Sequence, residues 1–85
     1  MVQPGFTVTV GTSSTTILNS DVNRVKVWLS NDSPTQIIYV TIGSTAVVGQ
    51  GVRLNPNGGK WETSSTGAIN AISTASGGTI VGAGQ

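Results

Sequence analysis

Apolar and polar residues alternate along most of this chain, with the period of two that is typical of β-strands. Phe6, Val8 and Val10 alternate with Thr7 and Thr9, so one face of that segment is apolar. No stretch repeats apolar residues at helical spacing over several turns. The pattern predicts short strands at residues 6–10, 15–18, 24–30, 36–42, 45–48, 52–54, 60–63, 67–73 and 79–81.

The two clearest strands, 24–30 and 36–42, each have one apolar face that we expect to fill the core. The residues predicted to point inward are Val25, Val27, Leu29, Ile38, Val40 and Ile42. The residues predicted to point outward are Arg24, Lys26, Trp28, Ile37, Tyr39 and Thr41. Because only a short turn separates the two strands, we expect them to pair as an antiparallel hairpin.

Turn-forming residues separate the predicted strands at regular intervals. Asn55-Pro56-Asn57-Gly58-Gly59 is the strongest turn signal, and Gly49-Gln50-Gly51 predicts a tight turn or bulge that needs positive φ. About eight short strands at this spacing predict an all-β single domain over residues 1–85, an antiparallel β-sandwich or jelly-roll-like barrel. We expect residues 1–5 and 82–85 to be flexible termini.

The composition removes most of the chemistry that enzymes use. The 85 residues include no cysteine and no histidine, which excludes disulfides, thiolate or imidazole metal ligands, and the commonest general base. The carboxylates are few, and Asp21 and Asp32 lie in turn-rich segments where capping a turn is their expected role. We therefore predict a protein that is not an enzyme, with no catalytic residue, no cofactor and no metal.

Charge is sparse, at 8% of residues with a net charge of +1. Four scattered basic residues do not form a track for nucleic acid. No apolar stretch is long enough to predict a membrane helix, and the N-terminus does not resemble a signal peptide. A low surface charge and a thin core favour self-association, so we expect a homo-oligomer. We expect no nucleic acid, membrane or small-molecule substrate as a partner.

The outward aromatic residues suggest a protein interface. Trp28, Ile37 and Tyr39 would form one apolar patch beside Arg24 and Lys26, and aromatic residues with arginine are enriched at interface hot spots. Two alternatives are that Trp28 and Tyr39 cover the edge of the core, or that the two faces are inverted. We expect Trp61 to plug one end of the core rather than to contact a partner.

Four segments together resemble a known group of proteins. They read NRVKVWLSN at 23–31, IYV at 38–40, GQGVRLNPNGG at 49–59 and GAINAI at 67–72. This order resembles short structural proteins of tailed bacteriophages, the head decoration or cement proteins. The resemblance implies a β-sandwich on an icosahedral shell, commonly a trimer, with the major capsid protein as partner and no cofactor. The chain departs from the group at Asn57, where glycine is usual, and in its glycine-rich tail.

The sequence therefore predicts a virion structural protein: a decoration protein, made in the host cytoplasm, that binds the outer surface of the phage head. A compact domain without reactive side chains suits a protein that clamps neighbouring capsid subunits. The main alternative is a tail-fibre, baseplate or glycan-binding module, with Trp28 or Trp61 stacking on sugar rings. A self-assembling fibre element and an enzyme are further alternatives.

Overall fold

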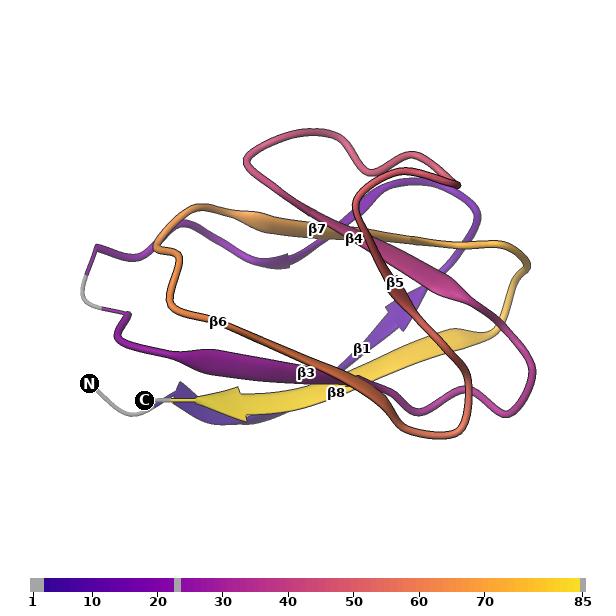
Figure 1. The fold of residues 1–85 in the computed structure, drawn as a ribbon, viewed down its shortest axis with the longest axis horizontal. Helices are drawn as coiled ribbons and strands as arrows, with labels where there is room; N and C mark the ends of the chain where they lie inside the picture. The colour runs from indigo at the N-terminus through magenta and orange to yellow at the C-terminus, as the bar shows by residue number, and fades with distance from the viewer. Residues whose placement is uncertain (1–2, 23, 85) are drawn as a thin grey trace.

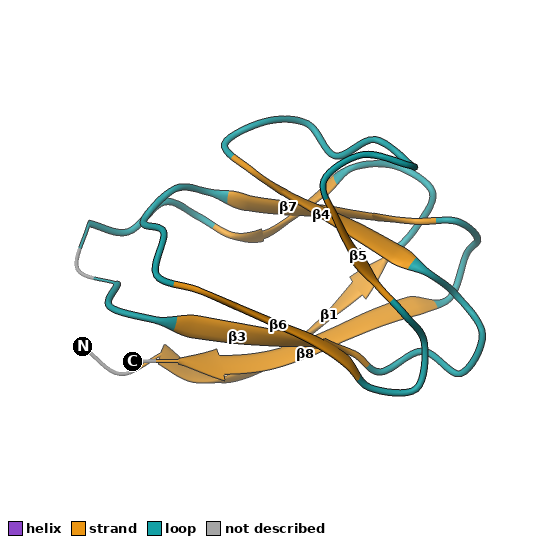
Figure 2. Cartoon of the chain, in the orientation of Figure 1, coloured by secondary structure: helices purple, strands orange, loops and turns teal. Residues whose placement is uncertain are grey.

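The computed structural model describes residues 3–22 and 24–84 and contains only strands, turns and loops there (Figure 2). Among these residues, no helix is long and apolar enough to cross a membrane. The strands are β1 (Gln3–Val10), β2 (Thr15–Leu18), β3 (Val27–Asn31), β4 (Ile38–Ile42), β5 (Val52–Leu54), β6 (Gly59–Thr63), β7 (Ile69–Ser73) and β8 (Gly78–Gly84).

The strands form two four-stranded sheets that pack face to face (Figure 1). Sheet 1 has the order β1-β8-β3-β6, and sheet 2 has the order β2-β7-β4-β5. Each strand of the first half of the chain has an antiparallel partner in the second half: the pairs are β1·β8, β2·β7, β3·β6 and β4·β5. The chain is therefore one long hairpin whose two arms roll up together into the two sheets. This is the strand order of a jelly roll, so the predicted fold class is confirmed.

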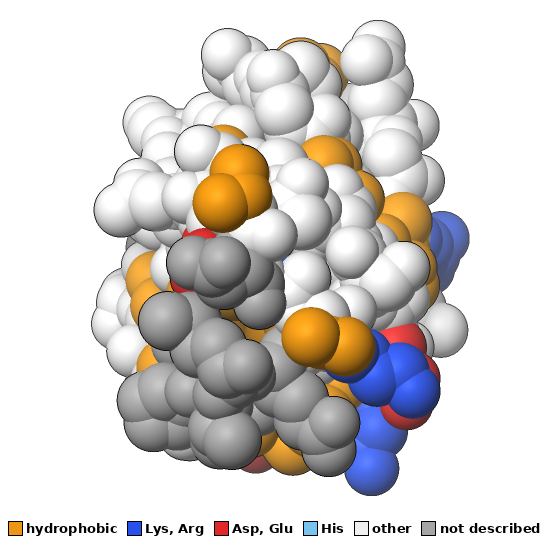
Figure 3. Space-filling view, turned by 90° about the vertical axis from the view of Figure 1, so that its left-hand side faces the viewer, with side chains coloured by type: hydrophobic (Ala, Val, Ile, Leu, Met, Phe, Trp, Pro, Cys, Tyr) orange, Lys and Arg blue, Asp and Glu red, His pale blue; other side chains and the backbone are white. Residues whose placement is uncertain are grey.

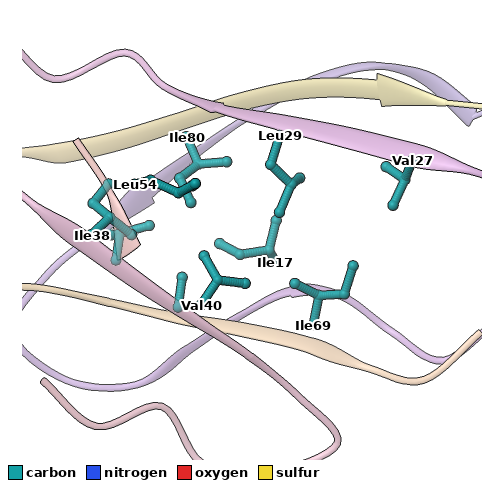
Figure 4. Packing of buried hydrophobic residues seen from close by; sticks show 10 residues of the cluster. Ile17, Val27, Leu29, Ile38, Val40, Leu54, Ile69 and Ile80 are labelled. Carbon is teal, nitrogen blue, oxygen red and sulfur yellow. The ribbon is translucent and has the colours of Figure 1, made fainter. Parts of the chain in front are cut away.

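The core lies between the sheets and is built from alternate residues of the strands (Figure 4). In β3 and β4, for example, Leu29, Ile38 and Val40 are completely buried. Residues between them face outward, as the period of two requires. The buried cluster consists of Val10, Ile17, Val27, Leu29, Ile38, Val40, Leu54, Ile69, Ala71 and Ile80.

The predicted hairpin of β3 and β4 is wrong. β3 pairs with β6 and β8 in sheet 1, whereas β4 pairs with β5 and β7 in sheet 2. The segment 32–37 is a crossing between the sheets instead of a tight turn. Packed sheets lie about 10 Å apart, a gap that a connection of this length can span.

A buried polar side chain, Asn31, holds this crossing in place. Its amide nitrogen donates hydrogen bonds to the carbonyl oxygens of Gln36 (2.8 Å) and Leu54 (2.9 Å). Its amide oxygen accepts one from the backbone nitrogen of Ser33 (3.0 Å), whose hydroxyl accepts one from the backbone nitrogen of Thr79 (2.8 Å). The strands β3, β5 and β8 and the crossing are therefore tied together at one end of the sandwich.

Several strand boundaries differ from the predictions. β3 begins at Val27 rather than residue 24, so Val25, expected in the core, is 60% exposed. Ile42, also expected inward, is 38% exposed because β4 leaves the core at its last residue. Residues 45–48 form part of the loop between β4 and β5 and not a strand.

Residues 3–5 and 82–84, which belong to the segments expected to be flexible termini, lie within strands. β1 begins at Gln3 and β8 continues to Gly84; Gln3 pairs with Gly84 and Phe6 with Gly82, with an irregular register between the two pairs, and residues 1, 2 and 85 lie outside the described part. Gly82 is buried beneath the ring of Phe6 and beside the carbonyl oxygen of Trp28, where an added Cβ would collide with both. Glycine at position 82 therefore allows close packing.

The two predicted turns are confirmed. Gly49 and Gly51 have φ angles of 89° and 87°, and an added Cβ on Gly51 would collide with the carbonyl oxygen of Val40. In the turn 55–59, Asn57 (φ 62°) and Gly58 (φ 99°) are both left-handed. Asparagine tolerates this conformation better than most residues do, so Asn57 fits where glycine is usual.

The substitution Asn31→Ala removes the side-chain amide that donates hydrogen bonds to the carbonyl groups of Gln36 and Leu54. We expect the free energy of unfolding to fall by about 2–4 kcal/mol. Chemical denaturation measures the change, with Asn19→Ala as the control because the side chain of Asn19 is exposed. Equal stabilities of the two variants would contradict this role for Asn31.

Candidate functional site

Arg24 was predicted to lie in an outward interface, and that prediction is wrong. The residue is only 6% exposed. Its guanidinium donates hydrogen bonds to the carbonyl oxygens of Ser65 (3.1 Å), Gly67 (2.9 Å) and Asn19 (2.5 Å). Arg24 therefore ties the β2–β3 loop to the β6–β7 loop, at the end of the sandwich opposite Asn31. A rigid fork of donors suits this role, since three carbonyl groups converge on one side chain.

The predicted patch also does not form one surface. Trp28 alternates with buried residues of β3 and lies on the outer face of sheet 1. Tyr39 alternates with buried residues of β4 and lies on the outer face of sheet 2, with Ile37 just before that strand. The two aromatic side chains therefore point away from each other, on opposite sides of the sandwich. The cause is the crossing between β3 and β4, which the sequence pattern had presented as a hairpin.

The structure brings Trp28 together with residues from β6. Trp28 lies opposite Glu62 in the β3·β6 register, and the ammonium group of Lys60 lies 6.0 Å from the centre of its ring. Glu62 also accepts a salt bridge of 3.1 Å from Lys26. We call this group the Trp28 patch, and its members are Lys26, Trp28, Lys60, Trp61 and Glu62.

The patch contains an open depression of about 420 Å³, lined by Trp28, Lys60, Trp61 and Glu62. Trp28 is 38% exposed there. Its other neighbour across the sheet is the small residue Ala83 of β8, so the ring stands above its surroundings on that side. The depression therefore offers an accessible aromatic surface with a cation and an anion at its border.

Trp61 has two roles in this arrangement. It lies opposite Leu29 in the register and packs against the core from β6, the edge strand of sheet 1. It also lines the depression. The sequence prediction that Trp61 covers the core agrees with the first role, although it does so along an edge of the sandwich. The second role was missed, together with Lys60 and Glu62, because the pairing of β3 with β6 cannot be read from local alternation.

The ion pair between Lys26 and Glu62 orients the patch more than it stabilises the fold. Their side chains are 57% and 60% exposed, so water and salt screen the attraction. Such exposed pairs contribute about 0–1 kcal/mol. The pair instead keeps a carboxylate beside the ring of Trp28, where a hydrogen-bonding partner can reach it.

The outer face of sheet 2 is less open. Tyr39 and Ile37 are half-buried, and the loop 43–51 arches above β4 and β7 (Figure 1). That loop is anchored, because Asn70 donates a hydrogen bond to the carbonyl oxygen of Ser44 (2.6 Å) and Ala46 donates one to the hydroxyl of Ser14 (2.9 Å). The Trp28 patch therefore presents the more exposed aromatic side chain of the two faces.

The chemistry available at the patch is that of noncovalent binding. It presents an indole face, two ammonium groups and one carboxylate. Over residues 3–22 and 24–84, no three histidine, cysteine, aspartate or glutamate side chains gather into a group that could hold a metal ion. Stacking, hydrogen bonding and ion pairing are the interactions that these side chains can make with a partner.

Comparisons with protein-family models, with curated proteins and with solved structures found no match. The jelly-roll topology, the Trp28 patch and the distribution of charge are therefore the observations that bear on function.

The substitution Arg24→Ala removes a buried guanidinium that joins two loops, so we expect it to act on stability. The free energy of unfolding should fall by about 2–4 kcal/mol, because three carbonyl groups lose their donor. The matched control is Arg53→Ala, since Arg53 is exposed and its guanidinium donates an exposed hydrogen bond to Asn55. Thermal unfolding of both variants measures the difference, and an equally small effect of the two substitutions would contradict the assignment.

Proposed function

We propose that this protein is a virion structural protein that decorates the outer surface of a phage head and stabilises it through the Trp28 patch. The observation that carries the proposal is the exposed indole of Trp28 on the outer face of sheet 1, bordered by Lys60 and Glu62. Tryptophan at the centre of a contact, with polar groups around it, is the usual composition of an interface hot spot.

The fold supports this role. A cement protein must hold its shape while the shell beneath it is under tension. Here each strand of the first half of the chain pairs with a strand of the second half, and Asn31 and Arg24 tie the two ends of the sandwich. Jelly rolls also occur in capsid and lectin domains, which is support by analogy of fold.

The size of the patch suggests how binding would work. Five side chains form a small contact, and a contact of that size gives a modest affinity for one copy. A shell presents many equivalent sites, so linked copies would bind far more tightly than isolated ones. The proposed partner is therefore a repeated surface of the major capsid protein.

The substitution Trp28→Ala tests the contact directly. We expect the affinity for capsids of the encoding phage to fall at least about 30-fold, because truncating a hot-spot residue costs about 2 kcal/mol or more. Co-sedimentation of the purified chain with capsids measures the change. Tyr39→Ala is the matched control, because it removes an aromatic side chain from the opposite face and should leave binding unchanged.

The stabilising effect has its own measurement. Capsids that carry the protein should release DNA at a higher temperature than bare capsids, and Trp28→Ala should abolish the difference at equal protein concentration. If the wild-type chain does not co-sediment with capsids and does not change DNA release, the decoration role is wrong.

A glycan-binding module is the second candidate, and the depression between Trp28 and Trp61 favours it. Indole rings stack on the apolar faces of sugars, and Lys60 and Glu62 could bond to hydroxyl groups at its border. Titration with purified host surface polysaccharide would then quench tryptophan fluorescence, and Trp28→Ala would remove the saturable part of that signal. Capsid binding without any such quenching would exclude this alternative.

A further inference from the structure

The four strands on one side of the sandwich, β1, β2, β7 and β8, contain no charged residue. Residues 1–20 and 63–85 carry no charged side chain. The charged residues are Asp21, Arg24, Lys26, Asp32, Arg53, Lys60 and Glu62. Because the jelly roll pairs β1 with β8 and β2 with β7, these four uncharged strands lie together on one side, while β5 and β6 form the other side. In the end view of Figure 3, the basic side chains gather at the right, whereas acidic side chains are visible at the left and at the right.

The uncharged side ends in an open strand. β1 pairs with β8 on one side only, and no described strand pairs with its other edge. Edge strands are usually protected by charged residues, and the opposite edges have them: Arg53 in β5, and Lys60 and Glu62 in β6. β1 has none, and its register is regular from Phe6 to Val10. The open edge is therefore suited to accept another strand.

Apolar side chains at this edge are incompletely covered. Phe6 and Val8 point toward the core but are only partly buried, and Leu18 of β2 is in the same state. The outward residues Thr7 and Thr9 are exposed. A strand added to β1 would cover apolar surface and satisfy the backbone groups of the edge, the two terms that favour strand addition.

The pattern of β1 is self-complementary. From Phe6 to Val10 it reads apolar, threonine, valine, threonine, apolar, and this order is the same in both directions about Val8. An antiparallel copy centred on Val8 would place Thr7 opposite Thr9 of the second copy and Phe6 opposite its Val10. The inward residues of one copy would then lie opposite the inward residues of the other. The outward threonines would likewise lie opposite each other, and such threonine pairs across two strands are favourable.

We infer that a second copy of this chain docks on β1, related by a two-fold axis near Val8. The contact joins the two copies of sheet 1 into one continuous sheet of eight strands, with β6 at each outer edge. Both Trp28 patches then lie on the same face of that sheet. A dimer with two patches on one face binds a repeated surface bivalently, which would strengthen the contact proposed above. This association differs from the trimer that the family resemblance implies.

Charge placement tests both the contact and its register. In the double variant Thr7→Lys/Thr9→Lys, introduced lysines face each other across the two-fold axis, and we expect association to weaken at least about tenfold. In Thr7→Lys/Thr9→Glu, the same register places each lysine opposite a glutamate, so association should be retained. Sedimentation velocity of the full chain over a wide concentration range measures both. Thermal unfolding of the two variants separates loss of association from loss of folding.

The control is Thr35→Lys, which adds a lysine at an exposed site of the loop 32–37 and should leave association unchanged. A wild-type chain that stays monomeric at submillimolar concentration overturns the inference, and so does a trimer. Association that both double variants retain, or that both lose, also overturns it. The measurement needs no capsid, so its failure is distinct from failure of Trp28 to mediate shell binding.

Discussion

A chain that crosses repeatedly between two sheets must find new partners for the backbone groups that leave each ladder. The rest of this structure depends on how that requirement is met. Asn31 meets it at one end of the sandwich by bonding to backbone groups from the crossing and from β5, and Arg24 meets it at the other end by collecting three carbonyl groups. An unpaired buried backbone group is costly, so these two side chains allow the hairpin to roll into two layers.

The sequence predicted the local part of this fold. Alternation located most of the strands, because a half-buried strand exposes every second residue whatever its partner. It did not predict which strands pair, because pairing joins residues far apart in the chain. The segment after Asn31 was therefore predicted to be a hairpin turn, although it crosses between the two sheets. A buried asparagine and a turn asparagine look alike in sequence, and so Asn31 was not recognised as a core residue.

The candidate site likewise has a part that local alternation predicts and a part that depends on long-range strand pairing. Trp28 could be predicted as outward from its neighbours Val27 and Leu29, which are buried. Its companions Lys60 and Glu62 could not, since only the β3·β6 pairing brings them beside it. The prediction for Arg24 was wrong for a different reason. β3 begins three residues later than the apolar pattern suggests, and the guanidinium of Arg24 turns inward to the loop carbonyls. Alternation therefore gave the wrong side for a residue that lies just outside the strand.

The pairing of β1 with β8 has a consequence for synthesis. The first strand of this domain, β1, has its neighbour β8 at the other end of the described chain, so sheet 1 cannot close until β8 has been synthesised. Contacts between such distant segments form slowly, because a long loop must close before they contribute. Until then the uncharged segment Phe6–Val10 has no ladder to protect it. Completion of sheet 1 therefore depends on β8, and the nascent domain remains open to chaperones until β8 has formed.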